Sequence, residues 1–172
     1  MDEDLKSKTG EFYGGVEPVE VGNLEDVKEQ KTLIPATKNV LFRIKDAEVR
    51  VSQDNTWRSI NLQLQIVNGI DSEGKYKNKV VFSNVAYYAD PHKYTKDFFK
   101  TKQHLIPLKM LRKAVEDTLD PIDGHTPERL IGKLIKGDIT IRSRKLIVEG
   151  VEEVSQENDV RYFKPVPLEE QV

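Results

Sequence analysis

Aromatic and basic side chains are interleaved along the middle of this 172-residue chain. Together they are the two kinds of side chain that hold single-stranded nucleic acid, because flat rings stack on bases and cations neutralise phosphates. Each stacked base contributes roughly 1–3 kcal/mol, so three or four rings give useful affinity. The candidate binding residues are Arg43, Lys45, Trp57, Arg58, Lys75, Tyr76, Lys77, Lys79, Tyr87, Tyr88, Lys93, Tyr94, Lys96, Phe98, Phe99, Lys100 and Lys102.

Trp57 is the only tryptophan, and it lies in the alternating stretch DNTWRSINLQLQIVNG, residues 54–69. In an extended strand, successive side chains point to opposite faces. One face then takes Ile60, Leu62, Leu64 and Ile66, and the other takes Trp57 with serine, asparagine and glutamine. A large ring on a polar face indicates a stacking platform. A ring covered by the chain's own loop or tail is the alternative.

The other rings also have structural alternatives. Tyr87 and Tyr88 are adjacent, so at most one of them faces a ligand, and the alternation does not decide which. At least one of Phe98 and Phe99 is expected to anchor its loop to the folded domain. Phe82 is assigned to the core.

The sequence contains no catalytic or metal-binding motif. It has no cysteine, which excludes disulfides, thiolate metal sites and thiol nucleophiles. Its three histidines are scattered, and neither a Gly-x-Ser-x-Gly elbow nor a phosphate loop is present. Only a fold that gathers Asp46, Glu48, Asp54 and Asp138 on a metal would make a small nuclease. We therefore expect no enzymatic activity, no metal and no cofactor.

Charge is strongly segregated along the chain. Residues 1–37 carry nine acidic and four basic side chains, a net charge of −5. Residues 75–113 carry ten basic and two acidic side chains, a net of +8, and residues 149–172 carry seven acidic and two basic, again −5. A basic middle between acidic ends favours an anionic partner for the middle. A solvated lysine-rich surface is the alternative explanation.

The length suits one domain with appended tails. We expect a flexible acidic arm over residues 1–32, a folded domain over 33–167 and a short acidic tail over 168–172. No run of 18 apolar residues is present, and MDEDLKSK lacks the pattern of a secretory signal. These features predict a cytoplasmic protein that makes no membrane contact. The sequence does not specify the oligomeric state.

The first strand is predicted in the stretch from residue 33 to residue 52, and its alternation changes phase once. Val40, Phe42 and Ile44 share one face, after which Ala47, Val49 and Val51 take the buried side. A slip of one residue indicates a β-bulge, which bends the strand as a small closed barrel requires.

The later elements follow from similar patterns. Strands are expected over 54–66 and 80–88, and apolar spacing predicts a helix over 106–120. A helical turn is expected at Thr126-Pro127, then a fourth strand over 134–143 with Ile139 and Ile141 inward. A fifth strand over 144–154, a turn at 155–159 and an extended piece over 160–167 complete the chain. Three strands, a helix and two more strands is the order of the five-stranded Greek-key barrel called the OB-fold. A generic α+β sandwich is the alternative.

The stretch 33–167 resembles small phage-encoded single-stranded DNA-binding proteins of the OB-fold type. The resemblance is carried by EGKYKNKVVFSNV, by the helix LKMLRKAVEDT and by the C-terminal RSRKLIVEGVEEVSQENDVRYFKPVP. It implies an OB-fold, single-stranded DNA as the ligand and a location in the cytoplasm of the host cell. It also implies phage or host replication and recombination proteins as possible partners.

The residues and the resemblance lead to one expected function, sequence-tolerant binding of single-stranded DNA in phage replication or recombination. An OB-fold module that docks a protein through the same aromatic–lysine segment is the first alternative, and a small nuclease or recombination accessory enzyme is the second. We also hypothesise that the acidic arm competes with DNA for the basic surface.

Overall fold

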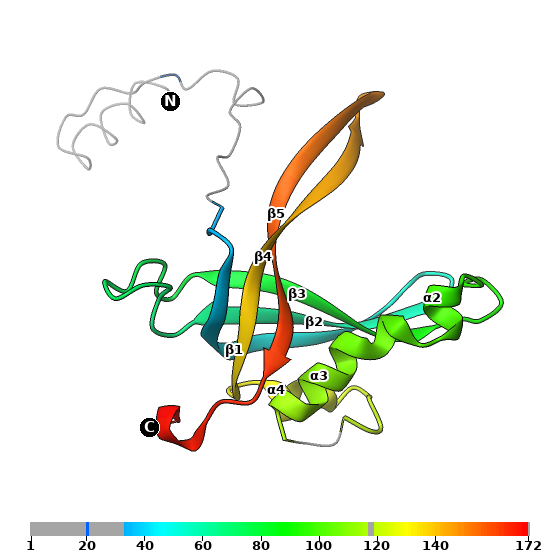
Figure 1. The fold of residues 1–172 in the computed structure, drawn as a ribbon. Coiled ribbons are helices and arrows are strands. Elements are labelled where there is room, and N and C mark those ends of the chain that lie inside the picture. Colours follow the sequence, from blue (N-terminus) through cyan, green and yellow to red (C-terminus); the bar gives the residue numbers. More distant parts are fainter. Residues whose placement is uncertain (1–19, 21–32, 117–118, 172) are drawn as a thin grey trace, which may run out of the picture. The chain divides into compact units, whose positions relative to one another are not determined.

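The computed structural model describes residues 20, 33–116 and 119–171, and the chain divides into two units, Met1–Thr32 and Leu33–Val172. The second unit is built on one five-stranded antiparallel sheet in the order β3-β2-β1-β4-β5. Its strands are β1 (Thr37–Val51), β2 (Trp57–Ile66), β3 (Val80–Ala89), β4 (Leu134–Val148) and β5 (Val151–Lys164). The prediction of a mainly β fold is therefore confirmed (Figure 1).

Short helices connect and flank the strands. They are α2 (Asp97–Lys100), the 3₁₀ turn η1 (Gln103–Leu105), α3 (Ile106–Ala114), α4 (Thr126–Leu130) and the 3₁₀ turn η2 (Leu168–Glu170). Helix α3 lies between β3 and β4, as predicted, with a proline in its first turn and Leu111 and Ala114 buried. It ends at Ala114, earlier than the predicted residue 120. The helical turn predicted at Thr126-Pro127 is the start of α4.

The predicted bulge in the first strand is confirmed. The β1–β2 register shifts between Ile44 and Asp46, and the buried side chains change from Val40, Phe42 and Ile44 to Ala47. The expectation that Val51 is buried is wrong, because its side chain is 52% exposed. The ladder between β1 and β4 ends at Arg43. The C-terminal part of β1, up to Val51, therefore has a ladder with β2 alone.

The next two strands divide their side chains between core and solvent. In β2, Ile60, Leu62, Leu64 and Ile66 are fully buried, as the alternation predicts. In β3, Val81 and Val85 are buried, whereas Phe82 is 56% exposed. The assignment of Phe82 to the core is therefore wrong, because it points to the opposite face from its buried neighbours.

The C-terminal strands differ most from the expectation. Strand β4 continues to Val148, and Glu149 and Gly150, both with positive φ, form a two-residue turn into β5. Positive φ at both positions is the geometry of a type I′ hairpin, for which glycine is favoured. The turn predicted at 155–159 is wrong, since these residues pair with β4 inside one long hairpin. Ile141, predicted to point inward, is 42% exposed.

The outer half of this hairpin, residues 141–158, forms a two-stranded ribbon that extends away from the rest of the sheet (Figure 1). We call it the β4–β5 ribbon. Every residue from 141 to 154 is exposed, including Ile147 at 81% and Val154 at 64%. A two-stranded ribbon alone is marginally stable in water, so the ribbon depends on the sheet at its base.

The two edge strands, β3 and β5, are not joined by ladder hydrogen bonds in the described residues. One side-chain link crosses between them, where the Ser83 hydroxyl donates to the carbonyl oxygen of Val160 at 3.0 Å. The core beneath the sheet gathers side chains from all five strands together with α3 and α4. Within residues 33–116 and 119–171, no helix is long and apolar enough to cross a membrane.

Candidate nucleic-acid interface

Trp57 packs against rings from residues 90–105, which we call the segment after β3. Its ring centroid lies 5.3 Å from that of Tyr94 and 6.3 Å from that of Phe99, and Tyr94 and Phe99 are 4.9 Å apart. Tilted and edge-to-face contacts at these distances are favourable between aromatic quadrupoles. The three rings therefore fasten the segment after β3 to the start of β2.

Two further rings extend this group, which we call the ring cluster: Trp57, Tyr94, Phe98, Phe99 and His104. Phe99 lies 5.2 Å from both Phe98 and His104. Phe98 is 50% exposed, whereas the other four rings are half-buried. At least one of Phe98 and Phe99 was expected to anchor this segment, and Phe99 does so. Phe98 remains exposed to solvent on one face.

A salt bridge fixes the same segment at a second point. The Lys93 ammonium lies 2.6 Å from a carboxylate oxygen of Asp54, in the turn between β1 and β2. Asp54 also accepts hydrogen bonds from the hydroxyls of Thr56 and Ser52, both at 2.7 Å. The Lys93 contact, with the hydroxyl contacts behind it, holds the pKa of Asp54 well below its usual range. Lys93, predicted to contact phosphate, is therefore engaged within the chain.

The structure shows which of the adjacent residues Tyr87 and Tyr88 faces outward, a choice that the sequence leaves open. Tyr87 packs against the core, and Tyr88 is 38% exposed. The Arg58 guanidinium carbon lies 5.2 Å from the centre of the Tyr88 ring, within cation–π range. Arg58 also donates to the side-chain oxygen of Asn55 at 3.0 Å. The exposed Tyr88 and the half-buried Arg58 thus form a pair, and Arg58 is the residue next to Trp57.

The predicted residues of the β2–β3 loop lie at the other end of these strands (Figure 1). Tyr76 packs against the core, and the Lys75 ammonium lies 5.3 Å from the Tyr76 ring centre. Lys77 and Lys79 are exposed. Because each strand residue advances the chain by about 3.3 Å, the ten residues of β2 separate this loop from Trp57 by about 30 Å. The candidate residues therefore form two groups rather than one.

The outer face of β1, β2 and β3 joins these two groups. Arg43 is paired with Gln65, and Gln63 with Phe82, so basic, amide and aromatic side chains stand in neighbouring rows. Phe82 is a ring that the sequence analysis missed as a candidate. Phe82, Asn84 and Tyr88 are separated by even numbers of residues, so alternation places them on the same face of the strand. Once Tyr87 is known to face the core, that shared face is identified as the outer one.

Most of the predicted cations remain available on this surface. Among the described residues, seven of the ten predicted cations are exposed and have neither an ion pair nor a cation–π contact: Arg43, Lys45, Lys77, Lys79, Lys96, Lys100 and Lys102. An exposed cation without an acidic partner can approach a phosphate without breaking a contact. Lys93 differs from this set because it already has Asp54 as its partner.

The four carboxylates considered for a metal site have separate local partners. Asp46 accepts from the backbone of Ala47, and Glu48 pairs with Arg50 at 2.9 Å. Asp138 accepts from the backbone of Asn39, and Asp54 binds Lys93. In the described part of the chain, no group of three or more histidine or acidic side chains could hold a metal ion.

Neither a protein-family model nor a curated protein matches the chain. The surface itself is an exposed aromatic and amide face between two groups of exposed cations.

Proposed function

We propose that the chain is a sequence-tolerant single-stranded DNA-binding protein that acts in phage DNA replication or recombination and is not an enzyme. The observation that carries the proposal is the outer face of β2 and β3. There, Phe82 and Tyr88 are exposed on the edge strand β3, beside the amide side chains of β2. Exposed rings beside hydrogen-bonding amide groups can stack on nucleobases, because every base has a flat π-face.

The proposed fold is an OB-fold barrel. The sheet order β3-β2-β1-β4-β5 would close in this way if β3 met β5, and α3 occupies the place between strands three and four that this fold requires. The hydrogen bond from Ser83 to Val160 supports the proximity of the two edges. In this fold, the outer face of strands two and three is a common surface for oligonucleotides.

Binding combines two contributions in this proposal. Bases stack on Phe82, Tyr88 and the open face of Phe98, which tolerates any sequence because every base has a π-face. Phosphates are neutralised by Arg43, Lys45 and the exposed lysines at both ends of the strands. Because this neutralisation releases counterions, affinity should fall steeply as salt is raised.

A fluorescence titration tests the function directly. The one tryptophan lies in the ring cluster, beside the proposed surface, so its emission should change when oligo-dT binds and should return when salt is added. No response to any single-stranded nucleic acid would contradict the proposal. Metal-dependent degradation of the oligonucleotide would instead favour the nuclease alternative.

A second candidate function, a protein-interaction module, is favoured by the β4–β5 ribbon. Its exposed apolar side chains include Ile147, Val151 and Val154, at 81%, 62% and 64%. Its β4 strand carries only basic charges over 141–148, and its β5 strand carries only acidic charges over 151–158. Arg142–Glu157 and Lys145–Glu152 pair these charges within the ribbon, so the exposed apolar side chains are what a second copy of the chain would cover.

Sedimentation velocity tests this candidate. If ribbons join two copies, the wild-type chain should associate as concentration rises, and the double substitution Ile147→Lys and Val154→Lys should keep it monomeric. A wild-type chain that stays monomeric at all concentrations would contradict it.

A further inference from the structure

A cavity of about 350 Å³ lies between β3, the segment of η1 and α3, and β5. Its volume falls at the lower end of the range of small-molecule sites, which is about 300–1,000 Å³. The lining includes Phe98 from the ring cluster, Asn84 from the outer face of β3, and Arg142, Arg161 and Tyr162 from the β4–β5 hairpin. The cavity is therefore continuous with the candidate interface, because Phe98 and Asn84 belong to both.

Tyr162 reaches this cavity through a distortion of β5. The β4–β5 register jumps from Lys136 opposite Lys164 to Asp138 opposite Arg161, so Tyr162 and Phe163 together oppose Gly137. Tyr162 has φ of 58°, a left-handed conformation that a tyrosine rarely adopts. Bulges of this kind turn side chains toward functional sites. Here the distortion leaves Phe163 buried and Tyr162 53% exposed.

Gly137 is part of the same arrangement. A Cβ atom at this position would lie 2.6 Å from the Val160 side chain and 3.4 Å from the Arg161 carbonyl oxygen. The first distance is closer than real Cβ atoms approach other atoms, so any side chain at residue 137 would displace Val160 in the bulged part of β5. The position of Tyr162 is therefore built into the packing of the hairpin.

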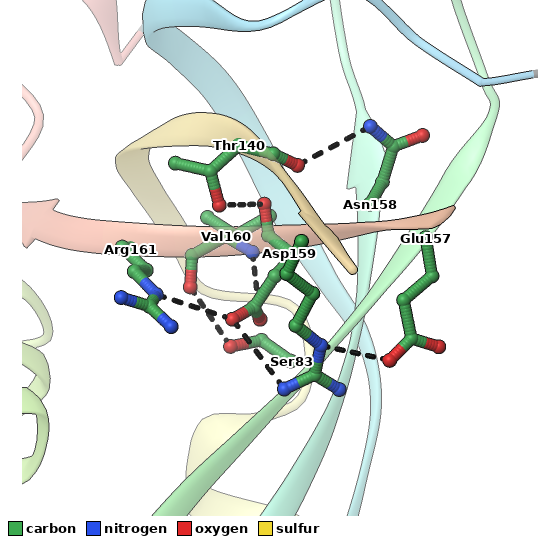
Figure 2. Close-up of polar contacts among 8 residues, drawn as sticks. Ser83, Thr140, Glu157, Asn158, Asp159, Val160 and Arg161 are labelled. Atoms are coloured by element: carbon green, nitrogen blue, oxygen red, sulfur yellow. Dashed lines mark hydrogen bonds and ion pairs between the residues drawn. The ribbon is translucent and has the colours of Figure 1, made fainter. Parts of the chain in front are cut away.

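Charged groups at the cavity are fixed and balanced (Figure 2). The Asp159 carboxylate, which is 8% exposed, lies 3.3 Å from the Arg161 Nε and 3.9 Å from Arg142. Arg142 also donates to Glu157 at 2.8 Å. Each guanidinium group of the cavity thus has a carboxylate partner, Asp159 within the lining and Glu157 outside it. Such a site suits a neutral ligand better than a phosphate.

The polar groups of the cavity can still recognise a ligand. Each guanidinium has five N–H donors in a rigid plane, and the contacts to Asp159 and Glu157 use only some of them. Bases expose carbonyl and ring-nitrogen acceptors, such as O4 of thymine, that guanidinium groups bind. In addition, the Nδ1 atom of His104 is buried and has no hydrogen-bond partner among the described residues.

We propose that this cavity is a base-binding subsite that takes one unpaired nucleobase of a bound strand. The base packs on the rings of Tyr162 and Phe98, and the remaining donors of Arg142 and Arg161 bind its acceptor atoms. A strand that stacks on the outer face of β3 reaches the cavity by passing over the edge of β3 at Asn84. This inference rests on the proposed function. It adds a site at which one base separates from the bases that stack on the outer face of β3.

Photo-crosslinking tests the subsite on the full wild-type chain. Oligo-dT with 5-iodouracil at single positions is bound, irradiated and digested, and the crosslinked residues are mapped by mass spectrometry. An adduct on Tyr162 is the expected result. Adducts confined to Phe82, Tyr88, Phe98 and the lysine-bearing segments would show that the strand binds the outer face but not the cavity. That outcome overturns the subsite and leaves the proposed function standing.

A pair of substitutions gives an independent measure. Tyr162→Phe keeps the ring and should bind oligo-dT as the wild type does, whereas Tyr162→Leu keeps bulk without a ring. Loss of one base–ring stack corresponds to about 5- to 150-fold weaker binding. Equal affinities for the two variants would overturn the subsite. If the wild type itself binds no oligonucleotide, the proposed function fails and the subsite fails with it.

Discussion

The indole of Trp57 meets the ring of Phe99 edge to face, with centroids 6.3 Å apart and planes at 88°. The ring that the sequence presents as a free stacking platform is therefore half-buried in contacts with its own chain. It joins the start of β2 to the segment after β3, and two of the exposed stacking candidates, Tyr88 and Phe98, lie near it. This changes which substitutions should affect stability and which should affect binding.

Phe99→Ala should destabilise the fold, because it removes the ring that contacts four members of the ring cluster. Full burial of a phenylalanine makes this change cost about 3–5 kcal/mol, and aromatic pairs contribute about 0.5–1.5 kcal/mol beyond area. For a half-buried ring we expect about 1–3 kcal/mol. Urea unfolding followed by Trp57 fluorescence measures it.

Phe98→Ala is the matched control, because Phe98 is the adjacent ring but is exposed. It should lower the free energy of unfolding by less than about 1 kcal/mol. Equal costs for the two substitutions would show that the ring cluster does not hold the segment as described.

Lysines of the same segment should differ in their effect on salt dependence. Lys96 is exposed and makes no ion pair among the described residues, whereas Lys93 binds Asp54. If Lys96 contacts a phosphate, Lys96→Gln should reduce the slope of log affinity against log salt by about 0.7. Lys93→Gln should leave that slope unchanged. Fluorescence anisotropy at several salt concentrations measures both, and the reverse ranking would contradict the surface assigned here.

Acid should loosen the segment after β3 through Asp54. In the unfolded chain this carboxyl has a pKa of about 3.9, and in the folded chain Lys93, Thr56 and Ser52 lower it. A lowered pKa in the folded state means that the contribution is complete above about pH 4 and is lost as pH falls toward the folded value.

Trp57 fluorescence follows this loss, since the tryptophan packs on the fastened segment. The wild type should show a change of emission only well below about pH 4, as pH approaches the lowered pKa of Asp54, and Asp54→Asn should lack that component. Superimposable pH profiles for the two proteins would show that the Asp54–Lys93 contact does not fasten the segment.

The acidic arm remains a separate hypothesis. Residues 1–32 lie outside the described residues apart from Glu20, and the stretch 1–37 carries a net charge of −5. If the arm competes with DNA for the basic surface, deleting residues 1–32 should tighten oligo-dT binding at low salt. The gain should shrink at high salt, where screening is stronger. A full-length variant with the acidic residues of the arm changed to their amides is the control, and unchanged affinity in both proteins would refute competition.

Local patterns predicted the first half of the fold well. The aliphatic row from Ile60 to Ile66 and the phase slip after Ile44 fix strand faces by alternation alone, and both are confirmed. The predicted turn of the C-terminal hairpin is wrong because SQEND contains more residues typical of turns than Glu149-Gly150 does. Only the pairing of β5 with β4 across that stretch decides between them.

The candidate surface was predictable in composition but not in arrangement. Interleaved rings and lysines are visible in the sequence, yet the contacts of Trp57 with Tyr94 and Phe99 depend on how a long segment folds back. Phe82 was missed because its exposure depends on the direction of Tyr87, which the adjacent tyrosines leave undecided. The cavity at Tyr162 depends on a bulge opposite Gly137, and no local sequence pattern predicts that bulge.

The most direct test of the account is an anisotropy titration of labelled oligo-dT with the wild-type chain and with Phe82→Ala. Leu168→Ala is the matched control, because Leu168 is also an exposed apolar residue, at 84%, but lies in η2 away from the strands β2 and β3 in sequence. We predict salt-sensitive binding by the wild type, about 5- to 150-fold weaker binding by Phe82→Ala and no change for Leu168→Ala. Wild-type binding that Phe82→Ala leaves intact, or no binding at all, would contradict the assignment of the outer face of β2 and β3 as the DNA-binding surface.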